Sequence, residues 1–180
     1  TVRWVENRGL MACTGSIWVP ALNTPAIFQG GANKTNPGGD AWRYRPMQIV
    51  SMNTAPEIYK LDGNSASCCA DNNKYGRVYV HAEGYYFVFS NRTGHFRHGR
   101  SLIYINGSNI AENRTHMWTN TDNGVNVQRT VYMKKGDYIQ MRDYAGGGSS
   151  HNWYYSTSSR HISYSYYNSL MLIYLGPNKW

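Results

Sequence analysis

The chain has 180 residues, a formal net charge of +8, and many Tyr (16), Trp (6) and Gly (18) residues. Aromatic residues favour strands and Gly favours turns, while the Ala, Leu, Glu and Lys that fill amphipathic helices are scarce, so the composition argues against a helical fold. No apolar run reaches the roughly 18 residues that span a bilayer as a helix, and the amino terminus lacks the apolar core of a signal peptide. We therefore expect a soluble, processed chain.

The first 45 residues are rich in Gly, Asn, Pro and Thr, with a short apolar piece at residues 17–19. Such a composition predicts extended chain and loops, with at most one strand. We therefore divide the chain into an amino-terminal segment, residues 1–45, that packs on one domain, residues 46–180.

From Met47 onward, short apolar runs alternate with turn residues such as Asn106-Gly107 and Asn123-Gly124. Neither helical periodicity nor an internal repeat is visible, so the pattern predicts an antiparallel sandwich or barrel. The predicted strands are residues 48–52, 58–61, 77–80, 85–90, 102–105, 109–112, 125–133, 138–142 and 170–175.

Two of these strands, residues 85–89 and 170–175, are apolar at every position. A strand in a two-layer sandwich buries only one face in the core, so the other face needs a cover. A loop, a ligand, another copy of the protein and the amino-terminal segment are all candidates for that cover.

The sequence contains four acceptor patterns for N-linked sugar, at Asn33, Asn91, Asn106 and Asn113. Four patterns together, each in a predicted loop or strand end, favour a secreted, extracellular glycoprotein.

The three cysteines, Cys13, Cys68 and Cys69, are too few for a disulfide scaffold and wrongly spaced for a zinc site. In an oxidising compartment we expect Cys13 to pair with one of the adjacent cysteines, because neighbouring cysteines bridge each other only with distortion. Three reduced thiols are the alternative.

The sequence shows no pattern for catalysis: it has no nucleophile elbow, no His-Glu-x-x-His and no phosphate-binding loop. We expect neither an enzyme nor a cofactor. Two imidazoles at His95 and His98 without a third ligand predict a basic loop rather than a metal site, and calcium at Asp122-Asn123 stays open. Multiple glycosylation patterns make nucleic acid a poor fit as a partner.

Two segments are candidate binding surfaces for a ligand or receptor. A basic cluster in a predicted loop suits sulfated glycans or an acidic receptor face. An aromatic segment offers large contact area at little entropic cost. The basic cluster comprises Arg92, His95, Arg97, His98 and Arg100, and the aromatic segment begins with Trp153 and Tyr154.

Several stretches together resemble the tumour-necrosis-factor (TNF) and complement C1q superfamily. Residues 76–90 resemble its short strand, Gly-ended turn and aromatic strand, and residues 131–139 resemble its strand, Lys-Gly-Asp turn and next strand. Residues 167–173 resemble the last strand, while residues 102–111 look more like the C1q version of the middle hairpin. The resemblance spans residues 76–176 and depends on the order and spacing of these elements.

The resemblance implies a jelly roll of two five-stranded antiparallel sheets that assembles as a homotrimer, with Phe87, Phe89 and Tyr167 at the three-fold axis. It implies a secreted or membrane-released TNF-like ligand that binds a cell-surface receptor between protomers. The alternative is a C1q-like recognition head that binds glycans or other surface targets through its loops, and a monomeric lectin-like sandwich is a third possibility.

Overall fold

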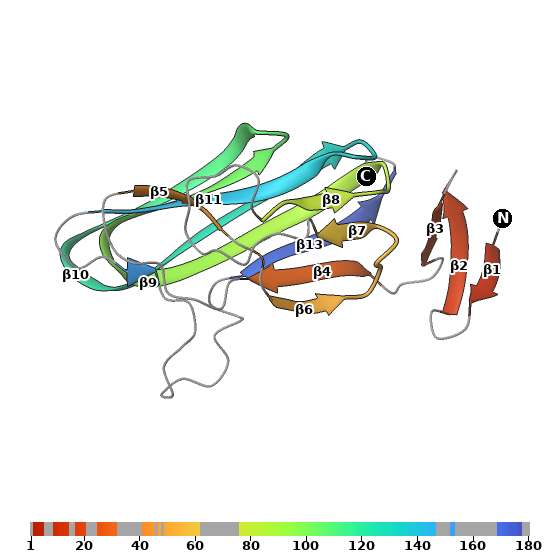
Figure 1. The fold of residues 1–180 in the computed structure, drawn as a ribbon, viewed down its shortest axis with the longest axis horizontal. Helices are drawn as coiled ribbons and strands as arrows, with labels where there is room; N and C mark the ends of the chain where they lie inside the picture. Colours follow the sequence, from red (N-terminus) through yellow and green to blue (C-terminus); the bar gives the residue numbers. More distant parts are fainter. Residues whose placement is uncertain are drawn as a thin grey trace.

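A computed structural model describes residues 2–5, 9–14, 17–20, 25–31, 41–45, 47, 49–61, 76–146, 152–153 and 169–177. Every regular element in this part of the chain is a β-strand, which confirms the predicted all-β class (Figure 1). A search of the same residues finds no helix suited to crossing a membrane. The strands are β1 (Val2–Val5), β2 (Gly9–Thr14), β3 (Ile17–Pro20), β4 (Ala26–Gly31), β5 (Ala41–Tyr44), β6 (Ile49–Asn53), β7 (Tyr59–Leu61), β8 (Val78–Val80), β9 (Gly84–Ile105), β10 (Ser108–Met133), β11 (Tyr138–Gly146), β12 (Asn152–Trp153) and β13 (Ser169–Gly176).

The strands form a two-layer jelly roll, because β9 and β10 are long enough to run from one layer into the other (Figure 1). The first sheet has the order β6-β4-β13-β9-β10 and uses residues 84–92 of β9 and 124–133 of β10. The second has the order β7-β8-β11-β9-β10 and uses residues 98–105 and 108–116. Strand β5 also pairs with β11, at residues 142–145, next to the residues of β11 that pair with β8. All these pairs are antiparallel, and the two sheets match the two antiparallel layers that the resemblance implies, with β5 as an additional strand in the second.

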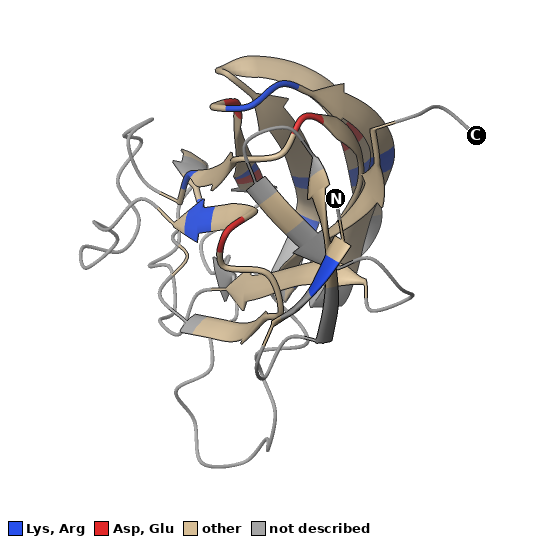
Figure 2. Cartoon of the chain, turned by 90° about the vertical axis from the view of Figure 1, so that its right-hand side faces the viewer, with Lys and Arg blue, Asp and Glu red and all other residues tan. Residues whose placement is uncertain are grey.

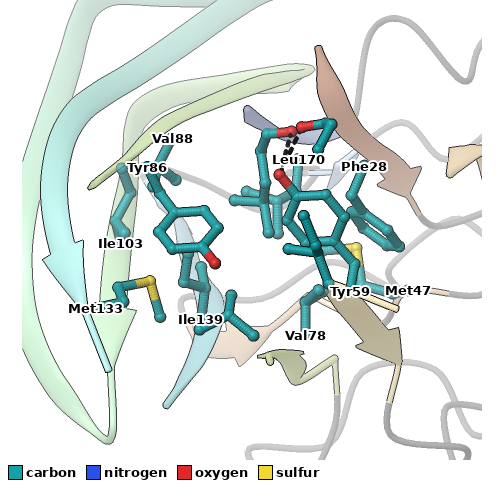
Figure 3. Close-up of a cluster of buried hydrophobic side chains, with 14 of the residues drawn as sticks. Phe28, Met47, Tyr59, Val78, Tyr86, Val88, Ile103, Met133, Ile139 and Leu170 are labelled. Carbon is teal, nitrogen blue, oxygen red and sulfur yellow. Dashed lines mark hydrogen bonds between the residues drawn. The ribbon is translucent and has the colours of Figure 1, made fainter. Parts of the chain in front are cut away.

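The hydrophobic core lies between the two sheets and is built from alternate residues of each strand. From the first sheet, Phe28, Tyr86 and Leu172 point inward, and from the second sheet Ile103 and Ile139 do so; each is at most 1% exposed. Figure 3 shows these layers meeting around Tyr59 and Tyr86. Each of these strands therefore turns one of its two faces into the core.

Tyr59 and Tyr86 carry hydroxyl groups into this core and bond to main-chain carbonyls there. The Tyr59 hydroxyl donates to the Ala26 carbonyl over 2.7 Å, which joins β7 of the second sheet to β4 of the first (Figure 3). The Tyr86 hydroxyl donates to the Ala82 carbonyl. Burial raises the pKa of both phenols well above the ordinary value, so both act as neutral donors.

All the strands predicted from residue 48 onward are present, and two further strands of the jelly roll, β4 and β5, lie within the segment of residues 1–45. Strand β4 lies in the middle of the first sheet, between β6 and β13, and β5 pairs with β11 in the second. The jelly roll therefore begins at β4, well inside the segment that composition indicated as loop. Within the part of the chain that the structure describes, β1, β2 and β3 form a three-stranded sheet of their own, where the Arg3 guanidinium lies 4.1 Å from the Trp18 ring centre.

A buried charged cluster joins the two layers on the β5 side of the sandwich. Arg45, directly after β5, donates two hydrogen bonds to the Asp143 carboxylate, of 2.8 and 2.9 Å, and another to the Ser90 hydroxyl over 2.7 Å. Asp143 belongs to the second sheet and Ser90 to the first, so one guanidinium spans the core. Ser101 also donates to Asp143, over 2.8 Å, and both charged side chains are essentially unexposed.

A second arginine, Arg92, lies beside the same carboxylate, with its Nε 3.6 Å from Asp143. Burial alone would raise the pKa of Asp143, but the charges of Arg45 and Arg92 and the hydrogen bonds from Arg45 and Ser101 hold it below the ordinary value. Asp143 is therefore ionised in the folded protein and balances buried positive charge.

We expect Asp143→Asn to lower the free energy of unfolding by about 3–5 kcal/mol, because it leaves buried guanidinium groups without their counter-charge. Glu83→Gln, an isosteric change at an exposed carboxylate, is the control and should cost less than about 1 kcal/mol. Chemical denaturation of both variants measures the difference. Equal costs would show that the network contributes nothing beyond its volume.

The difference in stability between the parent protein and Asp143→Asn should depend on pH. The pKa of Asp143 is lower in the folded state than the roughly 3.9 of an unfolded Asp. The ionised carboxylate therefore contributes its full stabilisation above the unfolded pKa, and this stabilisation is lost as the pH falls through the folded pKa. The stability gap between the parent and Asp143→Asn should therefore be constant from about pH 7 to 5 and shrink below about pH 4. A gap that stays constant into acid would contradict an ionised Asp143.

Candidate functional site

The outer face of the first sheet, on the side away from the core, is rich in apolar side chains. Strand parity places Tyr85, Phe87 and Phe89 of β9 on this face, because the intervening Tyr86 and Val88 are fully buried in the core. The neighbouring β13 contributes residues of the same parity, opposite these aromatic rings.

The strand register aligns these side chains into two rows across the sheet, which we call the apolar face. Phe89 is flanked by Gln128 and Met171, and that row continues through Gln29 to Met52. The next row runs through Thr130, Phe87, Ile173 and Ile27. Met52 keeps 42% of its surface exposed and the other apolar members are half-buried. The described part of the chain thus leaves this face uncovered.

Two tyrosines extend the apolar face toward the turn before β9. The Tyr85 and Tyr132 rings lie 5.1 Å apart, and the Tyr132 hydroxyl donates to the Glu83 carboxylate over 2.6 Å. That hydrogen bond raises the pKa of Tyr132, so the phenol stays a neutral donor. Tyr132 is 46% exposed, so the face ends in rings that combine apolar surface with a polar tip.

A groove of about 570 Å³ opens beside Phe89, between residues 111–113 and 126–129 of β10. Its polar walls come from Glu112, Asn113, Gln128 and Arg129. Amides and one charge of each sign can bind a polar partner, but they form no acid–base pair suited to catalysis. Among the described residues, no three His, Cys, Asp or Glu side chains gather as metal ligands.

The predicted basic cluster is not a loop: β9 continues as a strand through residues 84–105, and the Asn123-Gly124 segment lies within β10 opposite Thr93 and Gly94. Arg92 faces inward and is 0% exposed, so it belongs to the buried network and not to a binding surface. Arg97 and His98 are half-buried, and the Arg100 side chain is 39% exposed. The basic cluster is thus divided between the core and the surface.

The remaining predicted binding residues are only partly described. Trp153 lies on β12, which pairs with β9 at Gly94, and His95 pairs with Asn152, but their side chains lie outside the described part of the structure. Tyr154 and Tyr167 lie outside the described residues altogether, so the axial role of Tyr167 stays a prediction.

The structure describes only some of the residues in the glycosylation and cysteine predictions. Asn106 and Asn113 are exposed, Asn91 is half-buried with the parity of the apolar face, and Asn33 lies outside the described residues. Cys13 is half-buried on β2, and Cys68 and Cys69 are not described, so the cysteine pairing stays a prediction.

Solved structures of the same fold include a TNF and a complement protein. Eiger TNF from S. frugiperda is similar over 86% of this chain and 95% of its own, with 11% identity and a TM-score of 0.60. Murine APRIL is similar over 84% of this chain and 100% of its own, with 11% identity and a TM-score of 0.55. The globular domain of zebrafish complement 1qA is similar over 86% of this chain and 99% of its own, with 9% identity and a TM-score of 0.56.

No family model and no curated protein matches the sequence. At these identities the likeness shows the fold alone, and the chain therefore has a TNF/C1q-like jelly-roll fold, as the resemblance indicated.

Exposure decides which glycosylation patterns we expect to carry sugar after secretion. Asn106 and Asn113 are exposed to the transferring enzyme, whereas Asn91 is half-buried beside the apolar face. Peptide mapping after enzymatic deglycosylation in heavy-oxygen water should therefore mark Asn106 and Asn113 and leave Asn91 unmarked. Full occupancy at Asn91 would show that the apolar face is open to bulky polar groups.

Proposed function

We propose that this chain is a secreted, homotrimeric ligand of the TNF type that binds a cell-surface receptor and has no enzymatic activity. The observation that carries the proposal is the apolar face of the first sheet, with Phe87 and Phe89 at its centre. Large contiguous apolar surfaces on soluble proteins mark interaction sites.

A ring of three copies covers this face without a further partner. In a closed ring each protomer presents the same surfaces to its neighbours, so no apolar patch is left for open-ended assembly. Phe87 and Phe89 at the axis would then form a column of aromatic rings, each contributing about 1.5–3 kcal/mol when buried. The trimer explains why strands that are apolar on both faces occur in a secreted protein.

The groove beside Phe89 supports the receptor part of the proposal. It borders the apolar face, so in a trimer it would lie at the boundary between neighbouring protomers, where the TNF resemblance implies receptor binding. Its lining of Glu112, Asn113, Gln128 and Arg129 offers polar and charged contacts suited to a protein partner.

The trimer is tested by Phe89→Asp, which would gather three carboxylates in an apolar column. The cost of burying unpaired charges exceeds what the rim contacts can offset, so we expect monomer or aggregate in light scattering. Tyr79→Asp, a matched change on the outer side of the second sheet, should leave the protein trimeric. A well-folded trimer of Phe89→Asp would contradict the placement of β9 at the three-fold axis.

Receptor binding is tested on cells with fluorescently labelled trimer, in excess soluble heparin so that charge-driven adsorption does not contribute. Protease treatment of the cells should abolish staining, because the proposed receptor is a protein. Staining that survives protease but disappears after enzymatic removal of surface glycans would contradict the ligand proposal and favour the alternative, a C1q-like recognition head.

A further inference from the structure

The outer face of the second sheet carries arginines interleaved with aromatic rings. Strand parity directs Trp42 and Tyr44 of β5 and Arg142 and Tyr144 of β11 outward, because Met141 and Asp143 point into the core. In register, Arg142 lies opposite Tyr44 and Tyr144 opposite Trp42. The packing is dense, since Gln140 and Leu102 of the same parity are 0% and 4% exposed.

The same face continues across β9 to β10 and gains two more cations. Arg100 of β9 lies opposite Tyr144 on one side and opposite Arg114 of β10 on the other. We call the six residues Trp42, Tyr44, Arg100, Arg114, Arg142 and Tyr144 the arginine–aromatic face. Figure 2 marks the positions of basic residues along the strands in blue.

The guanidinium groups are placed over the aromatic rings. The Arg142 guanidinium lies 5.1 Å from the Tyr44 ring centre and 5.4 Å from that of Trp42. The Arg100 guanidinium lies 5.8 Å from the ring centres of both Trp42 and Tyr144. These distances fall within the range of cation–π attraction. The planar guanidinium carries its N–H donors in a fork whose geometry matches that of an anionic oxygen pair.

Two positive charges of this face lie next to each other on adjacent strands, which folding alone does not require. Arg100 and Arg114 lie directly opposite on adjacent strands, and like charges in that position are destabilising. Glu112 offsets part of the cost, with an ion pair to Arg114 and a longer one of 3.9 Å to Arg100. The Arg114 and Arg100 side chains remain 62% and 39% exposed. Local conflicts of this kind are expected at functional sites.

We propose that the arginine–aromatic face binds a sulfated polysaccharide. Sulfate groups accept the paired hydrogen bonds that a guanidinium fork donates, and the aromatic rings beside the arginines offer apolar surface to the sugar rings between the sulfates. A linear polymer can contact Arg100, Arg114 and Arg142 together. The formal charge of +8 adds long-range attraction for such a polyanion.

This site is separate from the apolar face, because the two lie on opposite outer surfaces of the sandwich. A trimer closed on the first sheet leaves the arginine–aromatic face in solvent. Three copies on one particle would then bind one long chain with increased avidity, and this last step alone depends on the proposed trimer.

The test measures binding to immobilised heparin for Arg100→Ser/Arg114→Ser and for Lys134→Ser/Lys135→Ser, a control that removes the same charge from the exposed turn after β10. The face variant should bind about tenfold more weakly, since each exposed charge contributes up to about 1 kcal/mol. The control should retain most of the affinity. Equal losses in the two variants would show attraction by net charge only and overturn the site.

Two further experiments test whether the guanidinium geometry and the sulfate groups are needed for binding. Arg100→Lys/Arg142→Lys keeps the charge but removes the planar fork, so it should still weaken binding. Desulfated heparin and single-stranded DNA should bind the parent protein much more weakly than heparin, and equal affinity for either would overturn a sulfated glycan as the occupant. Light scattering on the same samples separates this site from the trimer: lost heparin binding in an intact trimer concerns the arginine–aromatic face alone.

Discussion

A strand that is apolar on both sides has to bury both sides, and this constraint governs the first sheet. In β9, Tyr86 and Val88 fill the space between the layers, while Phe87 and Phe89 point the other way. The register continues the outward set through Ile173 and Met171 of β13, so the uncovered surface belongs to the sheet rather than to one strand. No rearrangement of side chains within a strand hides it, because strand parity fixes which residues share a face.

The same strand parity explains why some basic residues of β9 are buried and others are exposed. Strand β9 runs on through the segment that its charges made resemble a loop, so parity sends Arg92 into the space between the layers and Arg100 to the outer side of the second sheet. Arg92 joins Arg45 and Asp143 in a network that ties the two sheets together, whereas Arg100 reaches solvent above Trp42 and Tyr144. One run of basic residues therefore serves two purposes, cross-linking of the core and display of charge.

The sequence predicts the fold class and the strands from residue 48 onward, because hairpin turns such as Asn106-Gly107 and alternating apolar residues are local signals. It also predicts that the outward face of residues 85–89 needs a cover, because these residues are apolar throughout. It fails where tertiary pairing decides: β4 contains Gly30 and Gly31 in a Gly- and Asn-rich stretch, yet it lies between β6 and β13. The burial of Arg92 depends on an aspartate far along the chain, which no local pattern reveals.

The sequence contains a pattern that indicates part of the arginine–aromatic face, but the local composition favoured a loop at that segment. Residues 41–45 alternate aromatic and basic side chains with the period of a strand, which separates Trp42 and Tyr44 from Arg45 on opposite sides. The surrounding Gly and Asn residues favoured a loop, and the partners on β9 and β11 are distant in sequence. The strand period of that segment locates two of the six residues of the face, Trp42 and Tyr44.

The central claim is that the apolar face is covered by copies of the same chain. Its most direct test is the mass of the unmodified protein in solution, measured by sedimentation equilibrium over a range of concentrations. We predict a particle with three times the mass of the chain that persists on dilution. A monodisperse monomer at all concentrations would contradict the account, because no second copy of the chain would then cover the apolar rows around Phe87 and Phe89.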